Sequence, residues 1–179
     1  MYVFGYGSLV SPISAGRTLG RYVEELPAAR LRGHRRDWGV GVPLAFDDGT
    51  RATGAFLDVQ PDTGPGSVVL GTLLAVSPSE LVMLEAREAQ YDTVEVTAAI
   101  ESESVLAGPV FAFMGRAEHR ADPELVLPSR YLELVTLAVA TRGEAFAEEY
   151  WATTAPTDLP RHDGPYRFAD PIQERAARP

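Results

Sequence analysis

Two short segments of the sequence carry residue types whose spacing could support chemistry, and the first is Gly5-Tyr6-Gly7-Ser8-Leu9. It follows a short apolar run, where a glycine-rich turn leaves backbone N–H groups unpaired and directed into one small space. Such a group of amides binds an anion or a developing oxyanion. Because position 10 is valine, the segment lacks the third glycine of the dinucleotide-binding G-x-G-x-x-G pattern and the spacing of a nucleophile elbow. The alternative interpretation is a tight strand-to-helix turn with no binding role.

The second segment is an expected helix that carries a carboxylate on its apolar face. At helical spacing Leu84 and Glu88 lie one turn apart, and Leu81 and Glu85 complete the same stripe. Because the leucines must face the core, Glu88 is expected to be buried, with its pKa raised from about 4.3 toward the range of a general base. Glu85 close by would raise that pKa further. The alternative is that Glu88 pairs with an arginine and ends the helix, although Arg87 is expected to point about 100° away.

The composition excludes several kinds of catalytic site. The sequence has no Cys, and all 16 of its Lys and Arg positions are Arg, so thiol nucleophiles, Schiff-base lysines and phosphate-loop lysines are absent. The histidines, His34, His119 and His162, each stand alone without a second ligand at a spacing typical of a metal site. We therefore expect no metal ion and no cofactor.

The formal net charge of −9 makes nucleic acid and an anionic membrane unfavourable partners. One basic cluster, Arg30, Arg32, Arg35 and Arg36, departs from this trend. We interpret it as the solvated edge of a strand because it lacks interleaved aromatic residues. No apolar stretch approaches the ~18 residues that span a bilayer, and the N-terminus has no basic region typical of a signal peptide. The expected location is the cytoplasm.

The elements that must position the two segments follow from residue periodicity and from helix-start signals. Ser77 to Glu80 form an S-x-x-E capping box with proline at the first helical position, which is the best helix start in the chain. A cluster of strands followed by two helices predicts an α+β fold around a small, partly closed sheet. We expect one domain over residues 1–155 and a proline-rich, irregular tail over residues 156–179. Strands are expected over residues 2–6, 29–32, 38–42, 53–59, 68–76, 91–100 and 110–113, and helices over 12–19, 77–89, 129–143 and 144–153.

Taken together, three motifs resemble the γ-glutamyl cyclotransferase superfamily. They are YVFGYGSL at residues 2–9, LEAREAQYDTVEV at residues 84–96 and LPSRYLELVTLAVATRGEAFAEEY at residues 127–150. The Arg-Glu pair followed by Tyr-Asp-Thr is also similar to the ChaC branch, which acts on glutathione. The resemblance covers residues 2–150 and implies a small mixed, partly closed β-barrel with flanking helices.

The resemblance implies release of 5-oxoproline from a γ-glutamyl amide, in which the substrate's α-amine attacks its own γ-carbonyl and no enzyme nucleophile is needed. Glu88 would be the general acid and base, while the turn amides would hold the oxyanion or the α-carboxylate. A small γ-glutamyl compound is the expected partner, and a homodimer is compatible with the sequence. Two alternatives stay open: a non-catalytic ligand-binding protein of the same fold, and a biosynthetic enzyme that removes a γ-glutamyl protecting group. The implied substrate-binding residues are Tyr6, Gly7, Ser8, Leu9, Tyr91 and Tyr131.

Overall fold

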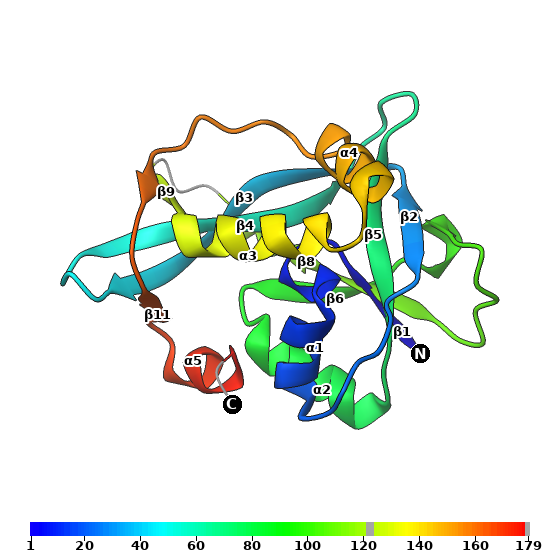
Figure 1. Cartoon of the computed structure of the whole chain (residues 1–179), viewed down its shortest axis with the longest axis horizontal. Coiled ribbons are helices and arrows are strands. Elements are labelled where there is room, and N and C mark those ends of the chain that lie inside the picture. Colours follow the sequence, from blue (N-terminus) through cyan, green and yellow to red (C-terminus); the bar gives the residue numbers. More distant parts are fainter. Residues whose placement is uncertain (121–123, 178–179) are drawn as a thin grey trace.

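Two β-sheets that curl toward each other as a half-barrel form the centre of the computed structural model, which describes residues 1–120 and 124–177 (Figure 1). This architecture confirms the expected α+β class. The strands are β1 (Tyr2–Gly5), β2 (Ala28–Arg32), β3 (His34–Phe46), β4 (Arg51–Pro61), β5 (Val68–Ala75), β6 (Tyr91–Glu95), β7 (Ile100–Glu101), β8 (Val110–Gly115), β9 (Leu125–Pro128), β10 (Arg161–His162) and β11 (Tyr166–Phe168). The helices are α1 (Pro12–Leu19), α2 (Pro78–Arg87), α3 (Ser129–Ala140), α4 (Glu144–Ala152) and α5 (Pro171–Ala177), with 3-10 turns η1 (Ser8–Val10), η2 (Thr97–Ala99) and η3 (Ala117–His119).

The first sheet has the strand order β6-β8-β1-β5-β2-β7, with β1 in its interior. β1 pairs antiparallel with β5 on one side and parallel with β8 on the other. Its residues Val3 and Phe4 are buried, which explains why the strand is a continuous apolar run rather than an alternating one. The glycine-rich turn therefore starts from a strand that is held on both edges.

The second sheet has the order β10-β9-β4-β3-β11 and is built on the long hairpin of β3 and β4. The hairpin turns at Gly49, whose φ of 90° is readily adopted only by glycine. Both strands are longer than the predicted ranges of 38–42 and 53–59. In β3 the charged residues before Trp38 continue the strand instead of forming a turn, and β4 pairs with them as far as Pro61. Arg36 in this stretch is fully buried, which the sequence pattern did not indicate.

The predicted helix-start signals are present in the structure. In α2 the Ser77 hydroxyl accepts a hydrogen bond from the Glu80 amide at 3.3 Å, and the Glu80 carboxylate accepts one from the Ser77 amide at 2.7 Å. Ser11 caps α1 by accepting from the Ser14 amide at 3.2 Å. These local bonds fix where α1 and α2 begin, and therefore which residues lie at the C-terminal end of each helix.

Helix packing brings the glycine-rich turn and the helix that precedes Glu88 to one end of the half-barrel. Figure 1 shows α3 lying across β3 and β4, with α1, α2 and α5 grouped below it. In α3 the buried face consists of Tyr131, Val135, Ala138 and Val139, at the spacing of an amphipathic helix. None of the helices in the described ranges is both long enough and apolar enough to span a bilayer.

The segment after residue 155, expected to be irregular, contains two short strands and a helix. β10 pairs with β9, and β11 pairs antiparallel with β3. α5 then packs against α1 and α2, and Asp170 caps its start by accepting from the amides of Ile172 and Gln173. The segment therefore wraps around the second sheet and returns to α2; its residues 178–179 lie outside the described ranges.

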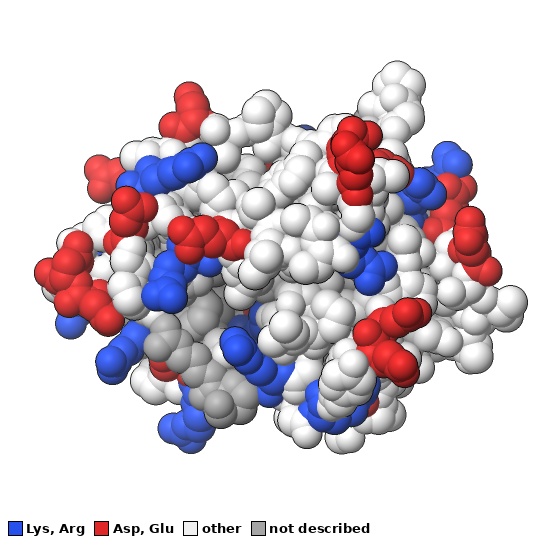
Figure 2. Space-filling model, in the orientation of Figure 1, with Lys and Arg blue, Asp and Glu red and all other residues white. Residues whose placement is uncertain are grey.

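The four arginines that form the basic cluster of the sequence do not form a basic surface. Arg36 is fully buried, so the prediction of a solvated strand edge is wrong for this residue. Figure 2 shows acidic and basic groups interspersed over the face that it draws. The other three arginines pair with carboxylates: Arg30 with Glu149, Arg32 with Glu101, and Arg35 with Asp37.

Candidate functional site

Arg87, the last residue of α2, joins the two segments that the sequence singled out. Its Nη2 donates to Ser8 Oγ at 2.6 Å, and its Nε lies 3.2 Å from Glu88 Oε1. Its other contacts bind α1, at Thr18 Oγ1 (2.7 Å) and Ser14 Oγ (3.1 Å). The glycine-rich turn and the end of α2 therefore meet at one place, although 79 positions separate Ser8 from Arg87.

Glu88 stands just beyond the end of α2 and is shielded from solvent. The helix ends before the predicted residue 89 because Glu88 has left helical dihedral angles, with φ −94° and ψ 46°. As a result its side chain meets that of Arg87, and the prediction that the two point apart is wrong. The Glu88 side chain is 18% exposed; burial raises its pKa, and the opposing charge of Arg87 does not reverse the shift. A carboxylate with raised proton affinity and some solvent contact can act as a general base.

Glu85 does not share this environment, contrary to the prediction from helical spacing. Its side chain is exposed and accepts a hydrogen bond from Thr93 Oγ1 at 2.9 Å. Leu84 is fully buried, but the stripe does not continue regularly beyond it because Glu88 is no longer helical. Burial of Glu88, rather than repulsion by Glu85, therefore raises the pKa of Glu88.

The turn after β1 presents unpaired backbone amides. Two hydrogen bonds back to the carbonyls of Gly7 and Ser8, at 3.0 and 3.2 Å, form η1. The amides of Gly7, Ser8 and Leu9 precede those donors in the chain, and no acceptor for them occurs among the described residues. A Cβ at position 7 would lie 2.8 Å from the Tyr131 hydroxyl, so any residue other than glycine there would have to displace this buried side chain. The Leu9 side chain belongs to the core, which leaves only its backbone for a substrate.

The three tyrosines that the resemblance implies in substrate binding lie near Glu88, but their hydroxyl groups differ in availability. Burial raises the pKa of Tyr6, Tyr91 and Tyr131 well above the usual value, and the charge of Glu88 adds to the shift in each case. Tyr6 donates to a carbonyl of β8, and Tyr91 donates to a carbonyl of β4 at 2.9 Å. Tyr131 instead accepts from the Leu57 amide at 3.4 Å, and its own proton has no acceptor among the described residues. Tyr131 is therefore the tyrosine of this group with a hydroxyl proton to offer.

We expect Tyr131→Phe to lower turnover by about 10-fold, because the lost hydroxyl donates to no described protein group and its proton is available to the substrate. It should also cost about 1 kcal/mol of unfolding free energy, because the buried Leu57 amide loses its 3.4 Å hydrogen bond to this hydroxyl. Tyr91→Phe should leave the turnover per folded molecule unchanged, because its hydroxyl is already bound to the buried Leu57 carbonyl, which then loses its donor. The expected loss for Tyr91→Phe is about 1–3 kcal/mol of unfolding free energy. Steady-state kinetics and thermal melts on both variants separate the two roles. Full turnover by Tyr131→Phe would exclude this hydroxyl from the reaction.

A second buried carboxylate, Asp58 in β4, lies close to the tyrosines and was not singled out from the sequence. Burial raises its pKa, whereas a hydrogen bond from the Gly115 amide, at 2.7 Å, lowers it. Gln60 also donates to it, and Arg120 Nε lies 3.1 Å from Oδ2. Because protein donors occupy both oxygens, Asp58 ties β4 to β8 rather than offering a second base. The sequence feature that could have singled out Asp58 is its position as an acidic residue within a strongly apolar strand.

Gln173 of α5 binds directly to the end of α2. Its Nε2 donates to the Arg87 carbonyl at 3.1 Å and to Gln90 Oε1 at 2.7 Å. The Gln173 side chain is 3% exposed, and its carboxamide oxygen has no partner among the described residues. The C-terminal segment therefore forms part of the surroundings of Glu88, which the sequence did not predict.

Replacing Gln173 by alanine should loosen this contact and hydrate Glu88. We expect the unfolding free energy to fall by about 1–2 kcal/mol, since one buried and one partly buried acceptor lose their donor. Lower burial should also reduce the pKa of Glu88, so the acid limb of the pH–rate profile moves to lower pH. Ile172→Ala, at a neighbouring position that is 66% exposed, is the control. An unchanged acid limb in Gln173→Ala would mean that α5 does not shield Glu88.

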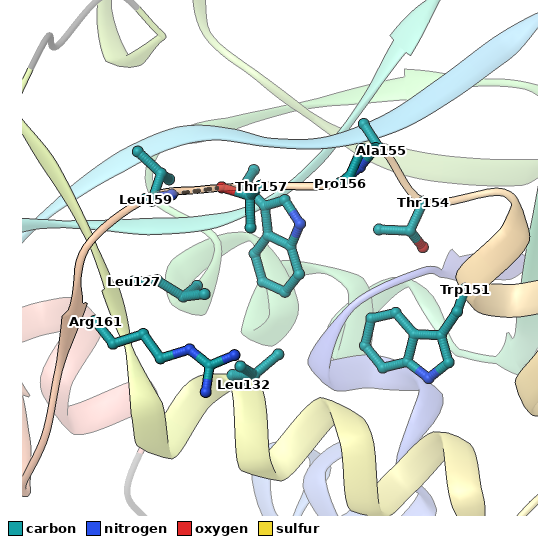
Figure 3. Close-up of a pocket in the computed structure, with 10 residues that line it drawn as sticks. Leu127, Leu132, Trp151, Thr154, Ala155, Pro156, Thr157, Leu159 and Arg161 are labelled. Atoms are coloured by element: carbon teal, nitrogen blue, oxygen red, sulfur yellow. Dashed lines mark hydrogen bonds between the residues drawn. The ribbon is translucent and has the colours of Figure 1, made fainter.

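A pocket of about 260 Å³ lies apart from these residues. Figure 3 shows Leu132, Trp151 and Arg161 among its walls. Trp38 also lines it and meets the Tyr131 ring edge-on, with ring centroids 6.3 Å apart. The pocket therefore reaches Tyr131 through this aromatic pair, and Glu88 does not line it.

The grouped residues can hold a small polar molecule and move a proton. The turn supplies N–H donors, Tyr131 supplies an O–H donor, and Glu88 supplies a base of raised pKa. Within the described ranges, no group of three or more His, Cys, Asp or Glu side chains could hold a metal ion. This set of groups suits an acyl transfer in which the substrate brings its own nucleophile.

Solved structures with the same arrangement of strands and helices identify the fold. No protein-family model matches the sequence, and no curated protein matches it either. The chain is similar to YkqA from Bacillus subtilis, with a TM-score of 0.62 and 18% identity over 90% of this chain and 56% of YkqA. It is similar to a γ-glutamyl cyclotransferase, with a TM-score of 0.60 and 15% identity over 98% of this chain and 96% of that one.

A third similar structure is a γ-glutamyl cyclotransferase specific to glutathione from yeast. Its TM-score is 0.55, with 15% identity over 88% of this chain and 98% of the yeast chain. The chain thus spans little more than half of YkqA but nearly all of both cyclotransferases. From the arrangement of its sheets and helices, the protein has the γ-glutamyl cyclotransferase fold, as the resemblance in its sequence implied.

Proposed function

We propose that this protein is a γ-glutamyl cyclotransferase, which releases 5-oxoproline and a free amine or peptide from a small γ-glutamyl amide. The observation that carries the proposal is the junction at Arg87, which brings the Glu88 carboxylate to the turn that holds Ser8. A base and a set of unpaired amides at one place suit a substrate that attacks itself. The fold shared with two cyclotransferases supports the same reaction class.

In the proposed reaction Glu88 works above its raised pKa, as a carboxylate. It takes a proton from the substrate's α-ammonium, and the freed amine attacks the γ-carbonyl carbon. The carbonyl electron pair moves to oxygen, where the amides of Gly7 and Ser8 and the Tyr131 hydroxyl donate hydrogen bonds to the negative charge. The bond from this carbon to the leaving nitrogen then breaks as Glu88 returns its proton to that nitrogen. Glu88 next takes the second proton of the ring nitrogen and passes it to the released amine. The products are the neutral five-membered lactam and the amine as its ammonium ion, and Glu88 is again ionised.

A non-catalytic ligand-binding protein is the second candidate, and the contact between Arg87 and Glu88 is the observation that favours it. Glu88 ends α2 and pairs with a cation, as a carboxylate with a purely structural role would. In that case the turn amides would hold a γ-glutamyl ligand without converting it. The contacts of Glu88 argue for catalysis, because among the described residues Arg87 contacts only one of its two carboxylate oxygens, whereas protein donors occupy both oxygens of the structural Asp58.

A substrate panel separates these candidates. The purified protein is incubated with glutathione, γ-glutamyl amino acids, γ-glutamyl alkylamines and an α-glutamyl dipeptide, and 5-oxoproline is quantified. We expect 5-oxoproline from at least one γ-glutamyl compound and none from the α-glutamyl dipeptide, which has no γ-amide to break. Preference for glutathione would indicate a role in glutathione turnover, whereas preference for alkylamides would indicate removal of a γ-glutamyl protecting group. Binding of γ-glutamyl compounds without 5-oxoproline release would favour the ligand-binding candidate.

A further inference from the structure

A fully buried cation lies behind the glycine-rich turn, and the proposed reaction does not use it directly. Arg36, in β3, is 0% exposed, and no carboxylate of the described residues pairs with it. Burial lowers its pKa from the ordinary arginine value, which an arginine can tolerate without losing its proton. Burying a charge without a counter-charge costs several kcal/mol unless other groups compensate. An apolar side chain would fill the same space more cheaply, so the charge requires an explanation.

The guanidinium of Arg36 is held entirely by neutral groups. Its carbon lies 3.5 Å from the centre of the Tyr150 ring, in cation–π geometry. All three of its nitrogens donate hydrogen bonds, which fixes the plane of the group. The acceptors are Thr154 Oγ1 at 2.8 Å, Leu70 O at 2.6 Å, Tyr6 O at 3.3 Å, Thr153 Oγ1 at 3.2 Å and the Tyr150 carbonyl.

One of these acceptors, the Tyr6 carbonyl, belongs to the turn. It receives a second hydrogen bond from the Tyr150 hydroxyl at 2.5 Å, so two donors converge on the same oxygen. The Tyr6 carbonyl and the Gly7 N–H belong to one peptide unit, which is trans, since none of the peptide bonds among the described residues is cis. In a trans peptide the N–H points opposite to the C=O. The Gly7 N–H therefore points away from Arg36 and Tyr150.

We propose that Arg36 and Tyr150 are positioning residues that orient and polarise the Tyr6–Gly7 peptide, so that the Gly7 amide binds an anionic group at the site. Donors on the carbonyl oxygen draw electron density through the peptide and strengthen its N–H as a donor. The buried positive charge favours negative charge on the far side of the same peptide. The anion is either the substrate's α-carboxylate or the oxyanion of the reaction, and in naming these groups the inference rests on the proposed function.

Tyr150→Phe is the sharpest test, because it keeps the ring under Arg36 and removes only the hydroxyl that binds the Tyr6 carbonyl. Binding of 5-oxoproline and of 2-pyrrolidone, which lacks the carboxylate, is measured by calorimetry, with Tyr2→Phe as the control. We expect about 10-fold weaker binding of 5-oxoproline, the effect of one hydrogen bond. Loss confined to 5-oxoproline places the carboxylate at Gly7, and an equal loss for 2-pyrrolidone places the lactam oxygen there. Unchanged affinity for both compounds would overturn the proposal.

A second measurement keeps this result separate from the proposed function. The Gly7 amide resonance in the ¹H–¹⁵N spectrum reports the state of the peptide without any ligand. We expect the Gly7 resonance to shift in Tyr150→Phe by more than the resonances of other amides at equal distance from Tyr150. In the control variant Tyr2→Phe it should stay at its wild-type position. If the wild type neither binds nor releases 5-oxoproline, the proposed function fails, and the Gly7 resonance still decides whether Tyr150 polarises the Tyr6–Gly7 peptide. A Gly7 resonance that does not move in Tyr150→Phe would refute this polarisation.

Arg36→Lys is the companion variant, because it keeps the charge and loses the planar set of donors. If orientation matters most, it should lower kcat/KM about as much as Tyr150→Phe does. If charge alone matters, it should retain wild-type kcat/KM, which would contradict the orienting role of Arg36. Rates are expressed per folded molecule, so that a loss of stability does not count as a loss of function.

Discussion

Glu88→Gln should reduce turnover by ~10²–10⁴-fold, which is the usual contribution of a general acid or base. Glutamine keeps the shape of the side chain but accepts no proton at neutral pH. Affinity for the γ-glutamyl group should change little, because the turn amides and Tyr131 remain. In the wild type the acid limb of the pH–rate profile should lie above pH ~4.3, the ordinary glutamate value, because burial raises the pKa of Glu88.

The same variant has a predictable effect on stability. Because the folded state raises the pKa of Glu88, it disfavours the ionised form, and this penalty is present above the folded-state pKa and absent below the unfolded-state value. Glu88→Gln should therefore melt at the same or a higher temperature than wild type at neutral pH, and the difference should vanish below pH ~4. Glu85→Gln, at the exposed position one turn earlier, is the control for both readouts. A lower melting temperature with an undiminished rate per folded molecule would assign Glu88 to a structural ion pair.

Arg87→Met should produce the second large effect, a loss of about 2–4 kcal/mol of unfolding free energy. Methionine retains the apolar stem but none of the hydrogen bonds to Ser8, Ser14 and Thr18, and it leaves Glu88 without its cation. The Arg87 side chain is 12% exposed, so water does not replace these contacts fully. Chemical denaturation at neutral pH measures the loss.

Arg87→Met should also move the acid limb of the pH–rate profile to higher pH. The charge of Arg87 lowers the pKa of Glu88, so its removal lets burial raise that pKa further. Since the base must be ionised, a given rate is then reached only at higher pH. Arg17→Met, at an exposed position of α1, controls for the loss of one positive charge. An acid limb that stays in place would mean that the pH dependence does not come from Glu88.

Much of the fold could be predicted from local signals in the sequence. The capping box at Ser77 and the cap at Ser11 set the starts of α2 and α1, because these bonds depend on residues three positions apart. The apolar run of β1 predicted an interior strand followed by the turn. The residues on which the proposed site is built, Glu88 and the turn at Gly7, were also singled out from residue type and spacing, and their role stays a prediction.

The features that were not predicted depend on contacts between distant parts of the chain. Helical periodicity placed Glu85 beside Glu88 and Arg87 away from it, but periodicity no longer holds where the helix ends, at Glu88. Arg36 was grouped with its charged neighbours because nothing local shows that its partners, at Tyr6 and Tyr150, lie far along the chain. Which tyrosine has a free hydroxyl likewise depends on carbonyls of other strands.

The structure of the C-terminal segment also depends on contacts with distant parts of the chain. Its composition, rich in proline and without periodicity, predicts an irregular segment rather than a domain. Its order comes from pairing with β9 and β3, and α5 is fixed by Gln173 against α2. None of these partners can be inferred from the residues of the segment alone.

A crystal structure of the protein with 5-oxoproline bound tests the central claim most directly. The account predicts the lactam between the turn and α2, with an oxygen within hydrogen-bond distance of the Gly7 or Ser8 amide. Its ring nitrogen should lie within reach of the Glu88 carboxylate. Binding elsewhere, such as in the pocket lined by Trp151 and Arg161, with no contact to the turn or to Glu88, would contradict it.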